Sequence, residues 1–392
     1  MGGAAGHINH VWEVHDFTFG QLRDLINKSF DGRLENITEK LDGQNILITY
    51  KNGKVLASRS TKHLKNFGED ALDIYQMGKY FRDRGTPCSV ERAYVTAMED
   101  FELIFKGYHA NVMENGSLWI NVEILHQENE NVIPYFKNQL RIHHVRLLDK
   151  DGKTLSTFSN DLITHIVKDA EALNTVYEIK KTNSITIKET CNHQLQGHLH
   201  HKLNLMQEAT DLNDDSTIED YLHTKIFEYA FAWIIREYHY DDEDFCSKIA
   251  DRWARGIKNP PINKLLEGVP EPVQKWVREH DSNSKSKVDF YREQFVEIFT
   301  ELGIWILNNL EGLATADPDK AVVKIKEKLK TAILHAQGKD EMSDHLWRLE
   351  NAGNLKSVVP TEGIVFEYEG QMLKLSGSFI PQLRLIGFYR FR

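Results

Sequence analysis

The sequence has little cysteine and no long apolar run. Its 392 residues include only three cysteines, Cys88, Cys191 and Cys246, which are too few and too scattered for a disulfide framework. No apolar stretch approaches the roughly 18 residues of a membrane span. The first ten residues, MGGAAGHINH, lack the apolar core of a signal peptide. We therefore expect a protein of the reducing cytoplasm that has no membrane partner.

The chain also lacks an excess of basic residues. It carries 48 Lys and Arg against 58 Asp and Glu, a formal net charge of −10, which argues against non-specific coating of duplex nucleic acid. One segment differs, because 371–392 holds four basic residues and no acidic one: Lys374, Arg384, Arg390 and Arg392. That segment is either a phosphate-contacting surface or a solvated basic terminus.

The first 160 residues show mostly strand signals after one helix. Apolar residues at helical spacing predict a helix within 17–30. Asn52-Gly53 between two apolar runs predicts a hairpin. In the segment LWINVEIL, Ile120 and Val122 alternate with Asn121 and Glu123, as in a strand with one apolar and one polar face. Residues 140–153 predict a further strand that ends at an Asp-Gly turn.

Helical patterns then dominate until strand signals return at 360–377. The pair Ser216 and Glu219 has the spacing of a capping box that opens a helix to about residue 237. A second helix is predicted over about 287–310, and a third between Asp317 as N-cap and Gly338. We predict an α+β chain in three parts: a β-rich part over 1–160, a mainly helical insert over 161–355, and strands over 356–392 that complete the β-rich domain.

The segment ITEKLDGQNILITY, Ile37 to Tyr50, holds the first candidate for chemistry. Asp42-Gly43 favours a two-residue hairpin turn in which Leu41 pairs with Gln44 and Lys40 lies opposite Asn45. In that interpretation Lys40 is an ordinary surface lysine. The alternative is that the Lys40 amine is a nucleophile. Other polar residues along the chain help to decide between the two interpretations.

Further polar residues follow Lys40 in a fixed order along the chain: Asn45, Arg59, Glu123, Glu362 and Lys374. With E-K-x-D-G-x-N, W-I-N-V-E, E-G-I-V-F and L-K, this order resembles the covalent nucleotidyltransferase superfamily of ATP-dependent RNA and DNA ligases and mRNA capping enzymes. Asn45 stands where DNA ligases usually carry arginine and is more similar to phage and editing RNA ligases. The segments FTFGQL, TEKLDGQN, ASRSTKHLKN and NVIPY look like RNA-ligase-like proteins of large tailed phages, which would act in the host cytoplasm.

The resemblance covers about 15–150 and 360–385 and implies both a fold and an activity. The fold would be an ATP-grasp-like nucleotidyltransferase domain of antiparallel sheets, interrupted by the large helical insert. The activity would be that of an ATP-dependent polynucleotide ligase of RNA-ligase type, which forms a covalent lysyl-AMP intermediate. AMP would then pass to the 5′-phosphate end of a nucleic acid, with RNA favoured, before the phosphodiester bond forms.

The resemblance also assigns roles to single residues. Lys40 would attack the α-phosphate of ATP, which requires a neutral amine, and a nearby cation such as Lys374 or a metal ion would lower its pKa. Lys374 would contact the α-phosphate as a second catalytic residue. Glu362, on a strand face that we expect it to share with Ile364 and Phe366, would hold Mg²⁺ or Mn²⁺.

Other side chains would surround the nucleotide: Glu39, Asn45, Arg59, Glu123 and His144. Glu39 would help to fix the adenine, and Asn45 and Arg59 would hold ribose or phosphate. Glu123 would bind the ribose or position the Lys40 amine. The family stacks an aromatic side chain on the adenine, where this chain offers His144 or its neighbour His143.

The chain departs from the family pattern at several points. Ser376 stands where ligases usually carry a second lysine, so Arg384 is a candidate replacement. Only 15 residues follow Gly377, which leaves no room for a C-terminal OB domain of roughly 40 residues or more. A histidine-rich stretch over 191–201 has no standard zinc-finger spacing, and we interpret it as a polar loop rather than a metal site.

Three alternatives to an RNA ligase stay open on the sequence alone. A DNA ligase acting on nicks would use the same lysine chemistry. An AMP-transferase could modify an acceptor other than nucleic acid, with the helical insert as the acceptor site. A nucleic-acid-binding or assembly protein could keep the ligase scaffold without catalysis, an alternative that Ser376 and the acidic net charge leave open.

Overall fold

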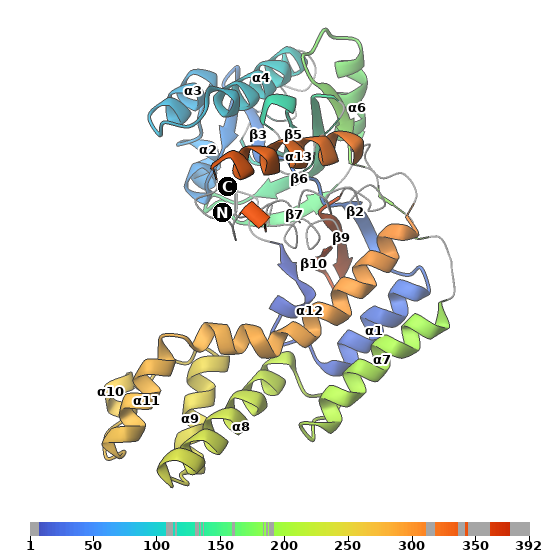
Figure 1. Ribbon diagram of the computed structural model, residues 1–392. Helices are drawn as coiled ribbons and strands as arrows, with labels where there is room; N and C mark the ends of the chain where they lie inside the picture. The colour runs from blue at the N-terminus through green and yellow to red at the C-terminus, as the bar shows by residue number, and fades with distance from the viewer. Residues whose placement is uncertain are drawn as a thin grey trace.

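Two sheets and a set of helices make up the structure, a computed structural model (Figure 1). It describes residues 8–106, 113, 116–129, 133, 135, 137–158, 161–182, 184–185, 187, 192–310, 318–335, 342–343 and 361–376. Most strand pairs in both sheets are antiparallel, so the predicted α+β class with antiparallel sheets is confirmed. Among the described residues, no helix combines the length and the apolar character that crossing a bilayer requires.

The larger sheet has six strands. Their bounds are β3 (Gln44–Lys51), β4 (Lys54–Ser58), β5 (Leu118–Leu125), β6 (Gln139–Leu148), β7 (Thr154–Phe158) and β8 (Glu178–Lys181). The strand order is β4-β3-β5-β6-β7, and β8 pairs in parallel with β6. Asn52 and Gly53 connect β3 to β4 with positive φ angles of 53° and 75°, as a type I′ hairpin turn requires, so this predicted hairpin is confirmed.

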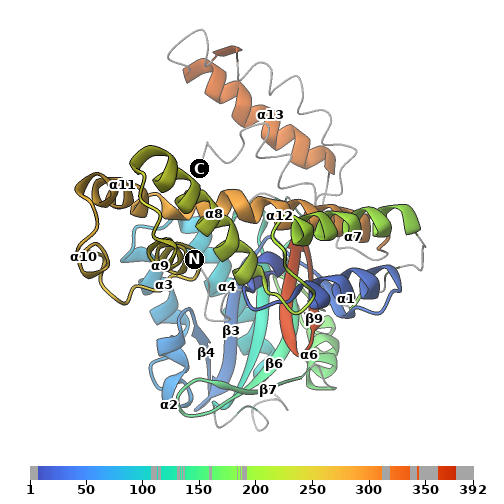
Figure 2. The same ribbon diagram turned by 90° about the horizontal axis from the view of Figure 1, so that it is seen from below.

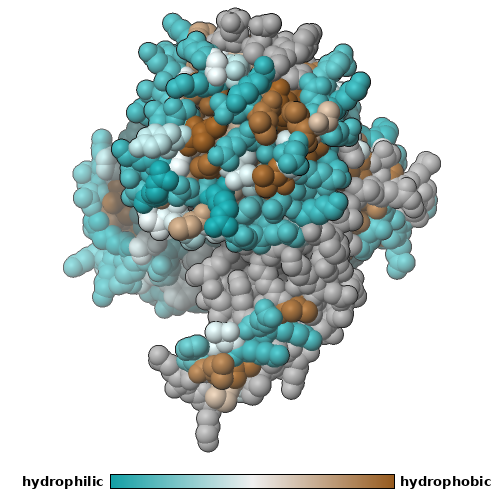
Figure 3. Space-filling view, turned by 90° about the horizontal axis from the view of Figure 1, so that it is seen from above, coloured by the Kyte–Doolittle hydropathy of each residue, from teal (hydrophilic) through white to brown (hydrophobic). Residues whose placement is uncertain are grey.

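Helices cover one face of this sheet: α3 (Ile74–Arg82), α4 (Cys88–Phe105) and α6 (Asp161–Glu171). Ile120, Val122 and Ile124 of β5 point into the core that these helices close. Asn121 and Glu123 lie on the opposite face, as the alternation of β5 predicts. Seen from the side of the helices, the surface is mainly hydrophilic with scattered apolar patches (Figure 3). The polar side chains of β5 are therefore on the face that these helices do not cover.

The smaller sheet has four strands in the order β1-β10-β9-β2. Their bounds are β1 (Asn9–His10), β2 (Glu35–Glu39), β9 (Gly363–Tyr368) and β10 (Gln371–Ser376). Ile364, Phe366 and Leu375 join a core with α1 (Phe19–Phe30) and α12 (Ser284–Asn308). Figures 1 and 2 both place β9 next to the six-stranded sheet. Strands from the two ends of the chain thus form one sheet.

Helices project from the two sheets as an arm on the lower left of Figure 1, and α12 runs from this arm to β9 and β10. The arm contains α8 (Ile218–Tyr238), α9 (Glu243–Ala254), α10 (Ile262–Leu265) and α11 (Glu271–Asp281). The predicted capping box of α8 is wrong by one residue. Thr217 is the N-cap and Asp220 its partner, because the Thr217 hydroxyl accepts from the Asp220 amide at 3.1 Å.

The remaining helices are short or peripheral: α2 (Lys65–Gly68), α7 (His193–Glu208), α13 (Pro318–His335) and the 3₁₀ turns Val11–Glu13, Thr61–Leu64 and Gln127–Asn129. α7 replaces the polar loop that we expected for the histidine-rich stretch, although Cys191 lies outside the described residues. α13 begins at Pro318, and its predicted caps Asp317 and Gly338 also lie outside the description.

Described residues of the predicted insert over 161–355 share their core with both sheets. At its start, α6 packs in the core of the six-stranded sheet and β8 pairs with β6. At its centre, Leu302 and Ile306 of α12 share a core with β9 and β10. A Cβ atom on Gly303 would lie 2.5 Å from the backbone oxygen of Ser376, so α12 lies directly on β10. The break expected at residue 160 therefore falls inside a packed unit.

Candidate functional site

The segment between β2 and β3 leads from one sheet to the other, and the predicted hairpin is wrong here. β2 pairs with β9 of the smaller sheet, whereas β3 pairs with β4 and β5 of the larger one. Lys40 lies between the sheets, and its backbone amide donates to the Gly363 carbonyl oxygen at 2.9 Å. Local turn propensity does not specify the partner of a strand, which is why the sequence suggested a hairpin.

Asp42 and Gly43 hold this segment against the larger sheet. The Asp42 carboxylate, 5% exposed, accepts from the Ile133 amide at 2.7 Å, and the Asp42 amide donates to the Tyr135 hydroxyl at 2.9 Å. A Cβ atom on Gly43 would lie 2.7 Å from the backbone oxygen of Ile124. These contacts require an aspartate and a glycine shortly after Lys40, and they fix the position of Lys40.

The Lys40 ammonium forms an ion pair with the Glu362 carboxylate. The two side chains are 33% and 20% exposed, so a ligand can still reach them. The prediction that Glu362 shares a face with Ile364 and Phe366 is wrong. Gly363 has a φ of +141°, which interrupts the alternation of the strand and leaves Glu362 facing Lys40.

Burial by itself would lower the pKa of Lys40, but its acidic neighbours, with the Glu362 carboxylate first among them, together hold the pKa above its ordinary value. Glu123 and Asp42 act in the same direction. The expectation that the pKa of Lys40 is lowered is therefore wrong for this arrangement, because its acidic neighbours raise it. Burial and the neighbouring Asp42 carboxyl raise the pKa of Glu362. The Lys40 amine thus carries a proton until its surroundings change.

Lys374 brings a second cation to the same gap between the sheets. It lies on β10, where it pairs with Val365 of β9 and His10 of β1, and it is only 9% exposed. Burial lowers the pKa of Lys374, and the Lys40 ammonium lowers it further. Its charge thus acts on Lys40 and Glu362, which brings the predicted residues of three separate segments together.

The larger sheet contributes Asn45 and Glu123 from neighbouring strands. They are directly paired between β3 and β5, and the Asn45 amide nitrogen lies 3.3 Å from the Glu123 carboxylate. A shorter contact of 2.6 Å leads from the Asn45 nitrogen to the side-chain oxygen of Asn121. Glu123 also lies 3.7 Å from Nε2 of His143. The polar face of β5 therefore lies beside Asn45, and the predicted role of Glu123 stays a prediction.

A β-bulge in β6 places both candidate histidines on this polar face. Asn121 pairs with His144 and Val122 pairs with Ile142, so His143 is the extra residue. His143 Nδ1 lies 3.2 Å from the Thr182 hydroxyl. Nε2 of His144 lies 3.2 Å from the Asn121 amide nitrogen, so the edge of this ring is engaged within the protein. A role of the His144 ring face in adenine stacking stays a prediction.

Arg59 lies at the end of β4 and contacts β3. Its Nη1 donates to the Asn45 backbone oxygen at 2.6 Å, and its guanidinium carbon is 4.7 Å from the Tyr94 ring centre. Two buried polar atoms of this pair, Arg59 Nε and Asn45 Oδ1, have no hydrogen-bond partner in the part of the chain that is described. Buried polar atoms normally have partners, so these two atoms have hydrogen-bonding capacity that the described residues leave unused.

Glu39 is 5% exposed at the end of β2, and its charge acts on Tyr135 and Arg141. Burial raises the pKa of Tyr135, and the Glu39 carboxylate raises it further. Four further residues of the site were not predicted from the sequence: Asp42, Asn121, Tyr135 and Arg141. Only the alternation of β5 could have indicated Asn121, because that pattern puts it beside Glu123.

Ser376 is the last described residue of β10 and pairs with Gly363. Arg384, its suggested substitute, lies outside the described residues together with most of the predicted basic segment. In the described part of the chain, no group of three or more His, Cys, Asp or Glu could hold a metal ion. Neither a protein-family model nor a curated protein matches this chain.

Proposed function

We propose that this protein is an ATP-dependent polynucleotide ligase of RNA-ligase type that forms lysyl-AMP at Lys40. One observation carries the proposal. Lys40 lies between two sheets in contact with Glu362, while Lys374 and Glu123 act on the same gap from other strands. These residues come from three distant segments, and an ordinary surface lysine needs no such surroundings.

The site suits a nucleotide with its sugar and phosphate groups. Asn45 Oδ1 is a buried acceptor and Arg59 Nε a buried donor, and neither has a partner among the described residues. A ribose hydroxyl can donate to the first, and a ribose or phosphate oxygen can accept from the second. The Lys374 ammonium supplies positive charge for the α-phosphate.

The reaction begins with removal of a proton from the Lys40 ammonium. Glu362 is in contact with Lys40 and has a raised pKa, so it is the nearest group able to accept this proton. The Lys40 nitrogen then bonds to the α-phosphorus of ATP as the bond to the pyrophosphate oxygen breaks. An oxygen of a 5′-phosphate end next displaces Lys40, and a 3′-hydroxyl finally displaces AMP.

A divalent ion suits Glu362 better than any other group of the site. Mg²⁺ usually takes one or two carboxylates and fills its other positions with water and phosphate oxygens, so a cluster of three protein ligands is not required. Asp42 lies close enough to Glu362 to raise its pKa, so the two acidic groups together favour a cation. When bound, Mg²⁺ would neutralise phosphate charge.

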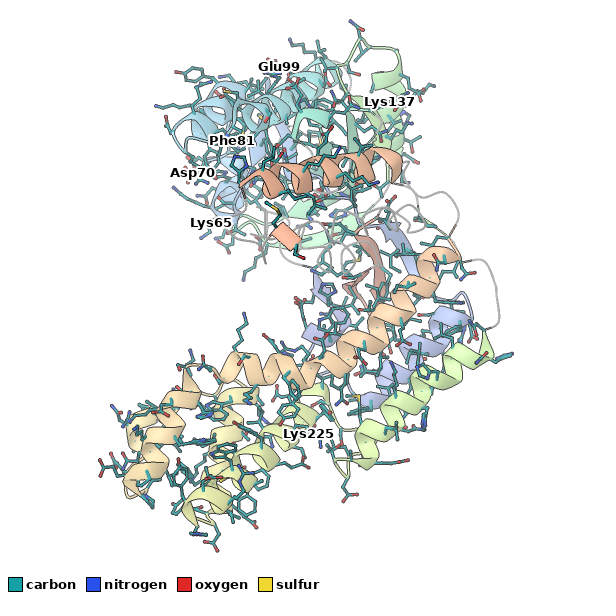
Figure 4. All side chains as sticks on the ribbon, in the orientation of Figure 1. Lys65, Asp70, Phe81, Glu99, Lys137 and Lys225 are labelled. Carbon is teal, nitrogen blue, oxygen red and sulfur yellow. The ribbon has the colours of Figure 1, made fainter. Side chains whose placement is uncertain are left out.

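The test is transfer of label from α-³²P-ATP to the protein in the presence of Mg²⁺. Wild-type protein should become labelled, and Lys40→Arg, which keeps the positive charge but not the amine, should not. Lys137→Arg is the control. Lys137 lies at the outer edge of the part formed by the six-stranded sheet and its helices (Figure 4), and its side chain is 69% exposed. Labelling of Lys40→Arg, or no labelling of wild-type protein, would contradict the proposal.

The labelled protein then identifies its acceptor. It is chased with 5′-phosphorylated RNA, with nicked DNA, and with a protein extract free of nucleic acid. Loss of label to RNA with formation of a longer strand is the expected result. Transfer to nicked DNA or to protein instead would replace the RNA-ligase assignment by one of its enzymatic alternatives.

A further inference from the structure

A chain of hydrogen bonds crosses three strands behind the candidate nucleotide site. It leads from Arg146 and His144 on β6 through Asn121 on β5 to Asn45 on β3. We call these four residues the relay. Three of the four have no role in the proposed transfer of AMP beyond the stacking suggested for His144. Each contact of the relay has a donor and an acceptor, so the direction of one contact restricts the next.

Arg146 sets the direction at one end, because a guanidinium has donors only. Its Nε–H donates to Nε2 of His144 at 2.9 Å. A neutral imidazole has one donor and one acceptor nitrogen, so Nε2 is the acceptor and Nδ1 carries the proton. Burial, followed by the charge of Arg146, lowers the pKa of His144 to about 3, and the ring is therefore neutral at physiological pH.

The direction then passes to Asn121. The atom of Asn121 that lies 3.2 Å from His144 Nε2 must be the amide nitrogen, because Nε2 has no proton to donate. Its amide oxygen consequently points the other way, toward Asn45. At 2.6 Å from this oxygen, Asn45 must present its amide nitrogen.

The last step leaves one atom of Asn45 for a ligand. The Val122 carbonyl at 3.5 Å and the Glu123 carboxylate at 3.3 Å also accept from the Asn45 nitrogen and favour the same orientation. Asn45 Oδ1 is therefore directed away from the relay. It is buried and has no partner in the described part of the chain.

We infer that Arg146 and His144 are positioning residues that act through Asn121 to hold the Asn45 carbonyl oxygen ready to accept from a ribose hydroxyl. This inference rests on the proposed nucleotide-binding function. It assigns the relay to discrimination between ribose and deoxyribose, whereas Lys40, Glu362 and Lys374 act at the α-phosphate.

Nucleotide binding tests the relay separately from chemistry. Lys40→Arg serves as the parent because it should bind ATP without forming lysyl-AMP. Calorimetry with Mg²⁺ gives its affinity for ATP, 2′-deoxy-ATP and 3′-deoxy-ATP. We expect the parent to bind ATP about tenfold more tightly than whichever analogue lacks the contacted hydroxyl. This ratio of affinities corresponds to the free energy of roughly one hydrogen bond.

The variant that tests the relay is Arg146→Met in this parent. Without its donor, His144 can change tautomer and the two amides can rotate. In this variant the affinity for ATP should fall by about threefold to tenfold and approach the affinity for the deoxy analogue. The affinity for the deoxy analogue itself should stay the same as in the parent. Arg146→Lys restores a donor-only group and should restore the preference. Lys137→Met, a change of the same kind at an exposed position outside the site, should leave the preference intact.

The outcomes separate the relay from the proposed function. A parent that binds ATP and both analogues equally would overturn the relay, and so would equal loss for all three ligands in Arg146→Met. If Arg146→Met does not fold, Asn121→Ala tests the next member by the same ratio. If wild-type Lys40 takes up no label while the ribose preference responds as expected, the proposed function fails and the relay stands.

Discussion

Lys40 is surrounded by acidic side chains, and its reactivity depends on when it gives up its proton. The Glu362 carboxylate raises the pKa of Lys40 against the opposing effect of burial. Only the neutral amine can attack phosphorus, so at neutral pH the reactive fraction is small. The rate of lysyl-AMP formation should therefore rise from neutral to alkaline pH, as the pH approaches the raised pKa.

Glu362→Gln tests this electrostatic coupling. The amide removes the charge that raises the pKa of Lys40, while burial, which lowers that pKa, remains. The rising limb of the pH–rate profile should move to lower pH, even though the maximal rate falls with loss of the carboxylate. Single-turnover labelling across the pH range measures both quantities. An unmoved profile would show that Glu362 does not control the proton of Lys40.

Lys374 offers a separate prediction about charge on the phosphate. Lys374→Met keeps the length and much of the volume of this side chain, which is 9% exposed, but removes its positive charge. We expect single-turnover labelling at saturating ATP to fall by about 100-fold, as when one preorganised group facing a developing charge is lost. Lys137→Met is the matched control on the surface. A change in ATP affinity alone would assign Lys374 to binding rather than catalysis.

At the scale of elements, the sequence predicted strands better than it predicted their partners. The alternation of β5 and the Asn52-Gly53 turn are local signals, and both are confirmed. The course of Lys40 to Gly43 between two sheets depends on pairing with β9, more than 300 residues away, which no local turn code contains. The bulge at His143 could not be predicted either, because it depends on how the residues of β6 pair with those of β5.

The same limit applies to the candidate site. The order of Lys40, Glu123 and Glu362 could be recognised from sequence, because each lies in a short motif. The contact of Asp42 with Ile133 and that of Asn121 with Asn45 could not, since each joins segments that are far apart in the sequence. The ion pair of Lys40 also reversed the expected direction of its pKa shift. Motifs thus identified reactive groups but not their electrostatic surroundings.

The contact between α12 and β10 gives a prediction at this scale. A Cβ atom on Gly303 would meet the Ser376 backbone oxygen at 2.5 Å, so Gly303→Ala must push the helix away from the strand. We expect the free energy of unfolding to fall by about 1–3 kcal/mol, as for other overpacked positions. Gly197→Ala in α7, where no atom lies within 4 Å, should instead stabilise by up to about 1 kcal/mol. Urea unfolding monitored by circular dichroism distinguishes the two.

At the scale of the molecule, the helical part and the smaller sheet share one core. Phe295 and Phe299 of α12 lie in the same cluster as Phe19 of α1 and Leu373 of β10. The larger sheet has its own core with α4 and α6. The gap that holds Lys40 is thus bordered by two separately packed sheets, and its shape depends on both cores.

Removal of 192–310 should abolish lysyl-AMP formation, because β9 and β10 would lose α12 and with it their apolar cover. Replacement of 243–281 by a flexible linker should preserve labelling, since it removes α9, α10 and α11 but keeps the contact of Gly303 with β10. Circular dichroism and α-³²P-ATP labelling of both variants provide the comparison. If the larger deletion still labelled Lys40 at the wild-type rate, the smaller sheet would not need the helices, and 161–355 would be an independent insert after all.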